Sequence, residues 1–265
     1  MNKTESVRIL QFTDPHLHES LDGTLLGLNT HQSLARVIEQ AKKEDPSPDA
    51  VLATGDISQD YSLASYQKFH RWMETFDCPF RWCPGNHDEK VLMTSVASFG
   101  SASSQTLELG DWLILMLDTS VPGEVPGNLT EYQFDLAKKT FQQHPNHHIL
   151  VAFHHQPVSM GSLWIDEQKI ANGEKLVTLA RQYPQVKALL WGHVHQEHHE
   201  QIGNLHMIST PSTCVQFKPR AVDFTLDTLG PGYRVIDLNQ DGSIETWVTR
   251  IEAMNYEIDY SVKGY

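Results

Sequence analysis

Polar clusters at the ends of five short apolar runs constrain the fold of this chain more than any other feature. The clusters are TDPHL (13–17), TGDIS (54–58), PGNHD (84–88), FHHQP (153–157) and WGHVH (191–195). Each follows a predicted strand, and in open α/β sheets the carboxyl ends of the strands form the crevice where ligands bind. The sequence therefore predicts that the five clusters meet in one polar crevice.

Short apolar runs alternate with amphipathic stretches of helical length, which predicts a mixed, largely parallel sheet with helices packed outside it. The predicted strands are 7–12, 50–54, 79–83, 112–118, 148–153 and 186–191. The predicted helices are 30–43, 63–76, 130–143 and 173–182, with a less regular pattern at 90–99. A capping box, Thr130 with Gln133, opens the third helix. From residue 205 the pattern changes to the strands LHMIST, YRVIDL and SIETWVTR, with a hairpin turn at Asp241-Gly242. The expected fold is α/β, with four layers in the order helix, sheet, sheet, helix.

Composition indicates one domain that covers residues 1–265. The chain is 40% hydrophobic, enough for one large core, and contains no linker-like stretch. Its first residues, MNKTESVRILQF, lack the features of a secretory signal, and its apolar runs fall far short of the ~20 residues that span a bilayer. We therefore expect a soluble, cytoplasmic protein. A net charge of -13 without basic runs argues against nucleic acid or an anionic membrane as a partner.

Several residues outside the clusters have only structural interpretations. Cys78, Cys83 and Cys214 match neither a zinc knuckle nor a redox pair, so buried reduced thiols are expected. Five of the fifteen histidines are assigned to the solvated surface: His70, His144, His147, His198 and His199. Residues 251–265 fit an arm, a dimer contact or a frayed tail, so a homodimer is one alternative.

The clusters supply two Asp, four His and one Asn that have the chemistry of metal ligands: Asp14, His16, Asp56, Asn86, His154, His193 and His195. Asp14 and His16 are two residues apart, so in an extended segment their side chains point the same way, and Pro15 steers Asp14 away from helical geometry. Seven ligands are too many for one ion. With one bridging carboxylate they serve two ions, as in sites for phosphoryl transfer whose ions lie roughly 3.5 to 4 Å apart.

The PGNHD cluster adds residues with other roles. The neutral amide of Asn86 fills a coordination position without adding negative charge that repels a phosphate. His87 is predicted to point past the metals toward the substrate, where an imidazolium stabilises or protonates the leaving alkoxide. Asp88 has two alternatives, a partner that orients a neighbouring group or a helix N-cap.

The order D-x-H, G-D, G-N-H-[DE], H and G-H-x-H across residues 14–195 resembles the calcineurin-like metallophosphoesterase superfamily. The resemblance implies a sandwich of two mixed sheets flanked by helices. It also implies that Asp56 lies between two metals, with Asp14, His16 and His195 on one and Asn86, His154 and His193 on the other. In the pair His154-His155, it implies that the first imidazole coordinates.

Three further stretches, LLGLNT (25–30), TPSTCVQFKP (210–219) and FTLDTLGPGYR (224–234), look like the bacterial class III 3',5'-cyclic AMP phosphodiesterases. By hypothesis, a hydroxide between the two ions attacks phosphorus in line with the 3' oxygen and yields 5'-AMP. Substrate contacts are expected from His16, Asp56, Asn86, His87 and His195. Asn29, Trp164 and the segment 212–217 are candidates for recognising the base, while Phe217 and Trp164 have core or lid packing as their alternative.

Two other functions remain open at this point. The same metals serve 2',3'-cyclic nucleotides, linear diesters, monoesters or phosphoproteins, so only the pocket walls decide between these substrates. A metal-dependent scaffold without catalysis is the alternative from another class of protein. Mixed imidazole, carboxylate and amide ligation favours Fe or Mn as the two divalent ions, with Zn behind them.

Overall fold

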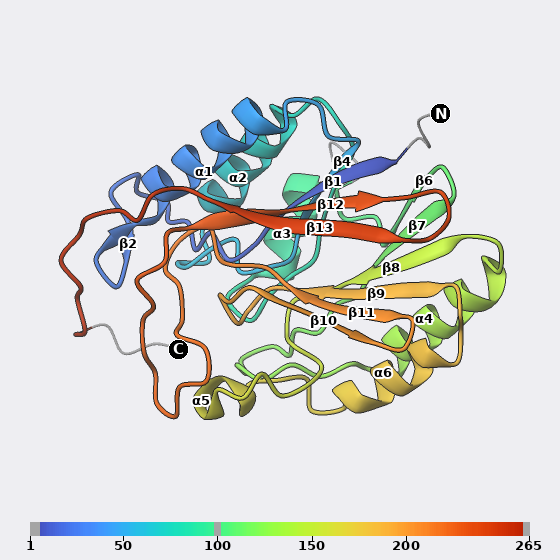
Figure 1. Ribbon diagram of the computed structural model, residues 1–265. Helices are drawn as coiled ribbons and strands as arrows, with labels where there is room; N and C mark the ends of the chain where they lie inside the picture. Colours follow the sequence, from blue (N-terminus) through green and yellow to red (C-terminus); the bar gives the residue numbers. More distant parts are fainter. Residues whose placement is uncertain (1–5, 98–101, 262–265) are drawn as a thin grey trace.

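The computed structural model describes residues 6–97 and 102–261, which form two stacked sheets flanked by helices (Figure 1). In spatial order, the first sheet contains β13 (Ile244–Arg250), β12 (Gly232–Leu238), β1 (Val7–Phe12), β4 (Ala50–Ala53) and β5 (Phe80–Trp82). The second contains β10 (His198–Ile202), β11 (Leu205–Ser209), β9 (Val186–Trp191), β8 (His148–Ala152), β7 (Trp112–Met116) and β6 (Thr106–Leu109).

Helices cover the outer face of each sheet. The first sheet carries α1 (Thr30–Glu44), α2 (Leu63–Glu74) and α3 (Lys90–Ala97), and the second carries α4 (Glu131–Gln143) and α6 (Gly173–Arg181). A hairpin of β2 (Thr24–Leu25) and β3 (Leu28–Asn29) precedes α1, and the single turn α5 (Leu163–Asp166) lies in the loop after β8. The predicted order of layers, helix, sheet, sheet, helix, is confirmed.

Both sheets are mixed, and their parallel strands set the position of the polar clusters. β1, β4 and β5 run parallel, as do β7, β8 and β9, whereas β12 is antiparallel to β1. The carboxyl ends of the parallel strands in each sheet therefore lie at one edge of that sheet. Each of the five polar clusters follows one of these strands.

Separate apolar cores fill the spaces between the layers. In β7, Ile114 enters the core between the two sheets, and Leu113 and Leu115 enter the core under α4 and α6. In β1, Ile9 faces the other sheet and Leu10 faces α1 and α2. Because both faces of these strands are covered, their sequences are continuous apolar runs rather than alternations.

The predicted elements all form, with ends within two residues of the predicted ones in the described part of the chain. The helix predicted at 90–99 runs to Ala97, and its last two residues lie outside the described residues. The sequence did not predict β2, β3, β6, β10 or α5. The sequence of β10, HHEQI, has no apolar pattern because this strand lies at a sheet edge and is largely exposed.

The capping box at Thr130 forms only in part. Thr130 Oγ1 accepts a hydrogen bond from Gln133 N at 3.3 Å, which is the N-cap contact of α4. Gln133 Oε1 accepts from Asp118 N at 3.3 Å, so this side chain ties α4 to the segment after β7. The reciprocal half of the box is thereby replaced by a tertiary contact.

The end of the chain folds back on the molecule. The turn at Asp241-Gly242 joins β12 to β13 as predicted, with Asn239 N donating to Ser243 O at 3.0 Å. Beyond β13, Asp259 N donates to Leu26 O at 3.1 Å, next to the β2–β3 hairpin. The described part of residues 251–265 therefore contacts its own chain at this point, and the choice between an arm, a dimer contact and a tail stays a prediction.

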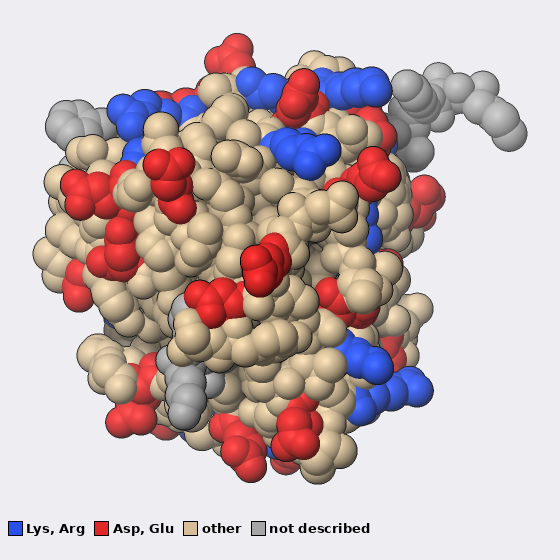
Figure 2. Space-filling model, turned by 90° about the vertical axis from the view of Figure 1, so that its left-hand side faces the viewer, with Lys and Arg blue, Asp and Glu red and all other residues tan. Residues whose placement is uncertain are grey.

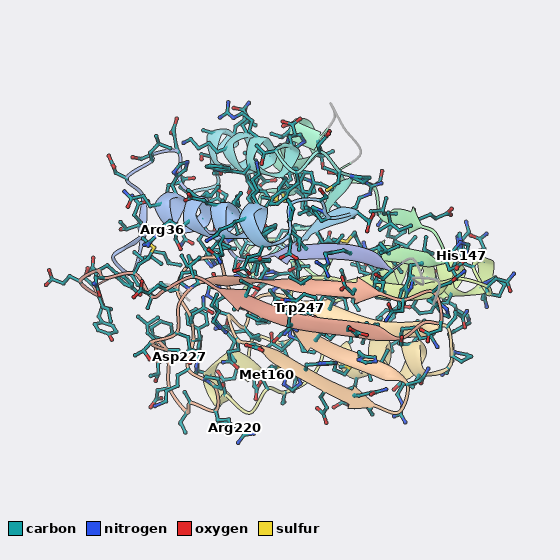
Figure 3. All side chains as sticks on the ribbon, turned by 45° about the horizontal axis from the view of Figure 1, so that its top comes forward. Arg36, His147, Met160, Arg220, Asp227 and Trp247 are labelled. Carbon is teal, nitrogen blue, oxygen red and sulfur yellow. The ribbon has the colours of Figure 1, made fainter. Side chains whose placement is uncertain are left out.

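The five histidines predicted to be solvated differ in their burial. Figure 3 shows His147 at the end opposite Asp227, and His199 is exposed. His70 is partly buried, and its ring packs edge-on against Phe80 and Trp82 with centroids 5.5 and 5.8 Å away. The remaining three, His144, His147 and His198, are half-buried.

The cysteines are free thiols in the described structure. Cys83 and Cys214 are buried as predicted, whereas Cys78 is only partly buried. Among the described residues, no helix combines the length and the apolar character that crossing a bilayer demands.

Candidate metal centre

The polar clusters converge at the end of the sandwich where β1 terminates. Their loops are joined through the backbone, because Asp14 N donates to Gly55 O and Gly192 N donates to His154 O, both at 3.0 Å. Six of the seven predicted ligands are at most 1% exposed: Asp14, His16, Asp56, His154, His193 and His195. The seventh, Asn86, is half-buried. The structure thus brings the five clusters together as predicted.

The backbone at these residues differs from the extended form expected for Asp14 and His16. Five of the seven have positive φ: Asp14 (53°), His16 (46°), Asp56 (52°), His193 (61°) and His195 (48°). Asp and His adopt this left-handed region more readily than most residues. The expectation of an extended segment was wrong, because the loop bends so that His16 N donates to Asp56 O at 3.0 Å.

One group of ligand atoms comes from Asp14, His16 and His195. His16 Nδ1 lies 2.6 Å from Gln59 Oε1, and His195 Nδ1 lies 2.8 Å from the Val215 carbonyl oxygen, so each Nδ1 donates. The two Nε2 atoms face each other at 3.3 Å, and Asp14 Oδ1 is 3.4 Å from His195 Nε2. In neutral rings these Nε2 atoms carry lone pairs, which repel each other unless a cation lies between them.

A second group surrounds His154. Its Nδ1 donates to the Thr54 carbonyl oxygen at 2.6 Å, which leaves Nε2 as the ligand atom. This Nε2 lies 3.1 Å from Asn86 Oδ1, 3.2 Å from His193 Nδ1 and 3.3 Å from Asp56 Oδ2. Asp56 Oδ2 is also 3.7 Å from His16 Nε2, so this one oxygen borders both groups.

The electrostatics of both groups fit positive ions. Asp56 Oδ2 and His193 Nε2 are buried without a hydrogen-bond partner in the described part of the protein. Burial lowers the pKa of His154, but attraction to Asp56 and Asp14 outweighs it and raises that pKa to about 9. Burial lowers the pKa of His16 to about 3, which keeps its Nε2 lone pair available. Carboxylate, imidazole and amide atoms in this arrangement are a suitable ligand set for two divalent metals.

His155 lies in the same cluster but is engaged elsewhere. Its Nε2 lies 3.0 Å from the Val125 carbonyl oxygen and therefore donates, so its Nδ1 accepts from Thr119 Oγ1 at 2.7 Å. The ring packs edge-on against His154 with centroids 4.7 Å apart. His155 thus supports the ring of His154, although His154, His155 and His193 lie close enough together to hold an ion, and the expectation that the first residue of the pair is the ligand stays a prediction.

The next two residues of the PGNHD cluster take different positions. His87 is half-buried, and its N donates to Asp56 Oδ1 at 2.8 Å. Asp88 accepts from Ile57 N and Ser58 N through Oδ1, at 3.0 and 3.2 Å. Asp88 therefore fixes the loop that carries Asp56, as in the first of its two predicted alternatives.

The candidates for base recognition have clear structural contacts. Asn29 is the N-cap of α1, with Oδ1 accepting from Gln32 N at 2.8 Å and Nδ2 donating to Leu21 O at 2.9 Å. Phe217 is 1% exposed and stacks on His195, with centroids 4.2 Å apart and 7° between the planes. Trp164 meets Phe217 edge-on at 5.0 Å. These contacts support the packing alternative for Phe217 and Trp164, and recognition of a base by the three residues stays a prediction.

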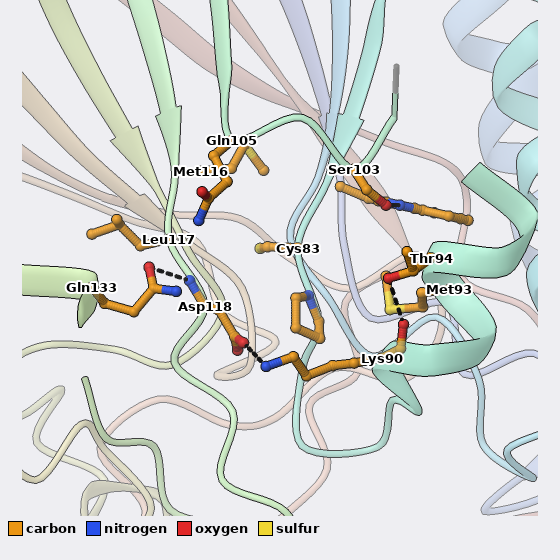
Figure 4. Close-up of a pocket in the computed structure, with 12 residues that line it drawn as sticks. Cys83, Lys90, Met93, Thr94, Ser103, Gln105, Met116, Leu117, Asp118 and Gln133 are labelled. Atoms are coloured by element: carbon orange, nitrogen blue, oxygen red, sulfur yellow. Dashed lines mark hydrogen bonds and ion pairs between the residues drawn. The ribbon is translucent and has the colours of Figure 1, made fainter. Parts of the chain in front are cut away.

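A cavity of about 250 Å³ adjoins the loop that carries Asn86 (Figure 4). Lys90 of α3 forms an ion pair with Asp118, which follows β7, and both line the cavity. The pair links the layer of the first sheet to that of the second. The ion pair holds Asp118 in place, and the next residue, Thr119, binds His155.

Sequence reasoning missed the groups that orient the ligands. Gln59 contacts His16, the Thr54 carbonyl contacts His154, and the Val215 carbonyl contacts His195. The hydroxyl of Thr13 donates to Asp14 Oδ2 at 2.6 Å. Thr13 and Thr54 each occupy the first position of their cluster, TDPHL and TGDIS. That shared position is the only signal of them in the sequence.

Comparison with known proteins identifies the family. A model of the calcineurin-like phosphoesterases matches residues 7–197, a range that contains all five polar clusters. The chain belongs to this family. Among curated calcineurin-like relatives, the 3',5'-cyclic adenosine monophosphate phosphodiesterase CpdA of Pseudomonas aeruginosa is 43% identical over 260 residues, which cover 98% of this chain and 96% of that protein. The protein of the same name from Escherichia coli K12 is 38% identical over 261 residues, covering 98% and 95%.

Solved structures with low sequence identity share the calcineurin-like phosphoesterase fold. A dimetal phosphatase from Danio rerio has a TM-score of 0.64 at 13% identity, covering 92% of this chain and 98% of that one. A purple acid phosphatase from yellow lupin has a TM-score of 0.61 at 14% identity, covering 94% of this chain and 55% of that one. These two structures bear on the fold alone.

Replacement of Gly192 by Ala tests how closely the site is packed. A Cβ at Gly192 would lie 2.0 Å from Thr13 Oγ1 and 2.7 Å from Asp14 Oδ2. We expect Gly192→Ala to lower the free energy of unfolding by about 1–3 kcal/mol through overpacking and to weaken metal binding by displacing Asp14. Thermal denaturation and elemental analysis measure the two effects.

Gly203→Ala is the control for Gly192→Ala, because a Cβ there meets open space at φ +67°. Backbone strain alone should cost it about 1–2 kcal/mol without loss of metal. Equal metal content in the two variants would contradict the close packing of Gly192 on Asp14.

Proposed function

We propose that this protein hydrolyses 3',5'-cyclic AMP to 5'-AMP with two divalent metal ions. The observation that carries the proposal is the convergence of seven potential ligands into two adjoining groups that share Asp56 Oδ2. The relatives named as 3',5'-cyclic AMP phosphodiesterases, at 38% and 43% identity over nearly the whole chain, support this substrate.

The proposed arrangement follows the two groups. Asp14, His16 and His195 hold one ion, Asn86, His154 and His193 hold the other, and Asp56 lies between them. When bound, such ions polarise the phosphoryl oxygens and lower the pKa of water toward neutrality. Fe or Mn suits this ligand set best, followed by Zn.

His87 is proposed to act on the leaving group. Its ring centroid lies 5.1 Å from that of His16, and its side chain is half-buried whereas that of His16 is fully buried. His87 therefore lies toward the rim of the site, where an incoming phosphate ester arrives. From there a protonated imidazole donates its proton to the 3' oxygen. The inner residues His16, Asp56, Asn86 and His195 are proposed to border the phosphate.

The overall charge of the chain does not itself attract an anion. The face seen in Figure 2 carries Asp and Glu over its centre, with Lys and Arg mainly at the upper rim and the lower right. The whole chain has a net charge of -13. Attraction of a cyclic nucleotide must therefore come from the local field of the metal centre, since a bound cation is the largest charge in such a site.

A broader phosphodiesterase is the second candidate, because the proposed ligands serve any phosphate ester. We expect 3',5'-cyclic AMP to be turned over faster than 2',3'-cyclic AMP and a nucleotide monoester by the purified, Mn-loaded protein. Initial rates on the three substrates at equal concentration measure this. A negligible rate on 3',5'-cyclic AMP together with rapid turnover of another substrate would contradict the proposed specificity. It would leave the proposed metal centre unaffected.

The adjacent residues His154 and His155 give a matched test of the ligand set. Both are fully buried, but only His154 turns a ring nitrogen, Nε2, toward Asp56 and Asn86. We expect His154→Asn to lose at least about 100-fold in metal affinity, because removal of even an outer partner costs about 10–100-fold. His155→Asn should keep both ions, as measured by metal titration and elemental analysis. Equal loss in both variants would contradict the assignment of His154.

His87→Asn tests the catalytic proposal separately from metal binding. General acid catalysis contributes typically about 10²–10⁴-fold, so kcat on 3',5'-cyclic AMP should fall by that order while metal content is unchanged. A substrate with an activated leaving group, such as a p-nitrophenyl phosphodiester, should be much less affected because it needs no proton on departure. Full activity of the metal-loaded variant on the cyclic nucleotide would remove His87 from the mechanism.

A further inference from the structure

A chain of buried side-chain hydrogen bonds leads away from Asp14 into the sandwich. Thr13 Oγ1 donates to Asp14 Oδ2 at 2.6 Å, and Thr54 Oγ1 donates to Thr13 Oγ1 at 2.8 Å. Gln11 Nε2 in turn donates to Thr54 Oγ1 at 2.7 Å. Gln11 belongs to β1 and its side chain lies between the sheets, since the same Nε2 reaches the Trp191 carbonyl oxygen of β9 at 3.2 Å.

The chain continues to a buried arginine of β12. Thr210 Oγ1 donates to Gln11 Oε1, and Arg234 Nε donates to Thr210 Oγ1 at 3.2 Å. Together the residues form what we call the relay: Arg234, Thr210, Gln11, Thr54, Thr13 and Asp14. All of them are at most 1% exposed.

The direction of the relay is fixed by the chemistry of its two ends. A guanidinium only donates hydrogen bonds and a carboxylate only accepts them. Arg234 therefore makes Thr210 the donor to Gln11, and Asp14 makes Thr13 the acceptor from Thr54. The Trp191 carbonyl, also an acceptor, fixes the amide of Gln11 with its nitrogen toward Thr54. Every donor thus points toward Asp14, and bonds aligned in this way polarise one another in a low-dielectric interior.

Arg234 places a positive charge at the far end of the relay. Its acceptors in the described structure are neutral oxygens, including the Ser209 carbonyl at 2.8 Å and Thr246 Oγ1 at 3.1 Å. Burial lowers its pKa to about 10, which leaves it protonated near neutral pH. A buried charge is costly to keep, and the attraction of Glu197 offsets only part of that cost, since burial still lowers the pKa of Arg234. The relay connects this charge to the carboxylate of Asp14.

The two carboxylate oxygens of Asp14 have different hydrogen-bond partners. Oδ2 accepts from Thr13 and, at 3.0 Å, from His193 N. Oδ1 is directed at the ligand nitrogens, 3.4 Å from His195 Nε2 and 4.0 Å from His154 Nε2. His193 N also lies 3.2 Å from Oδ1, so its backbone N–H is shared by both oxygens, and the hydrogen bond from Thr13 is what distinguishes Oδ2.

We propose that Arg234 is a positioning residue for the metal centre, acting through the relay to orient Asp14 and to withdraw electron density from its carboxylate. The inference rests on the metal centre of the proposed function and assigns a role to residues outside it. It also assigns a function to Thr210 and Arg234, which lie in the stretches 210–219 and 224–234.

Titration with Co²⁺ tests the relay without relying on activity. Thr210→Val removes the hydroxyl from the relay at constant shape and leaves every ligand in place. We expect it to weaken the affinity of one of two Co²⁺ sites by about tenfold, as for other outer partners, and to shift the visible absorption of the bound ion. Thr210→Ser, which keeps a hydroxyl, should restore both values toward the wild type.

Thr246→Val is the matched control, because Thr246 also accepts from Arg234 but lies off the path to Asp14. It should leave Co²⁺ affinity and the spectrum unchanged. Thr54→Val breaks the relay at a second point and decides the result if Thr210→Val fails to fold.

The outcomes separate the relay from the proposed function. Wild-type affinity and spectrum in both relay variants, or equal changes in Thr246→Val, would overturn the role of Arg234 and leave the metal centre intact. Failure of the wild-type protein to bind Co²⁺ at all would instead overturn the metal centre, and the relay with it.

Discussion

The close contact of two buried carboxylates, Asp14 and Asp56, with buried imidazole nitrogens governs the rest of this structure. Removing a carboxylate from water costs several kcal/mol, so each must be held by donors or by a cation. His193 N and His87 N supply backbone donors, one to each carboxylate. The remaining oxygens and the facing nitrogens need positive charge between them. The left-handed loop residues, the closely packed Gly192 and the relay all serve to hold this arrangement.

The convergence of the site was predictable because the topology requires it. Parallel strands end at one edge of a sheet, so the clusters after β1, β4 and β5 share one edge and those after β8 and β9 share another, and the stacking of the two sheets brings the two edges together. The loop conformation was not predictable, since Asp14 and His16 bend to satisfy hydrogen bonds with a loop about 40 residues away that no local pattern reveals. Thr13 and Thr54 were hidden for a related reason: at a strand end, a threonine is expected for its β-branched shape, whatever its hydroxyl binds.

The aromatic residues near the site explain why the substrate is harder to derive than the chemistry. Phe217 is stacked on His195 and closed off by Trp164, so it stabilises the ligand ring. Ser212 Oγ donates to the Asp14 carbonyl oxygen at 2.7 Å, so the start of this segment lies against the metal site. These residues therefore position the proposed metal ligands Asp14 and His195 through packing and hydrogen bonds. The choice between nucleotide bases depends on the side chains that line the substrate pocket, and these have no distinctive pattern in the sequence.

The placement of β12 between β1 and β13 also determines when the molecule is completed during synthesis. β1 leaves the ribosome first, but its antiparallel neighbour begins at Gly232, near the end of the chain. Until then one edge of β1 is unpaired, and an open apolar edge is a template for association with other chains. The same late strand delivers Arg234. The nascent protein therefore carries all seven proposed ligand residues before β12 can complete the first sheet, and the unpaired edge of β1 is open to association with other chains during that interval.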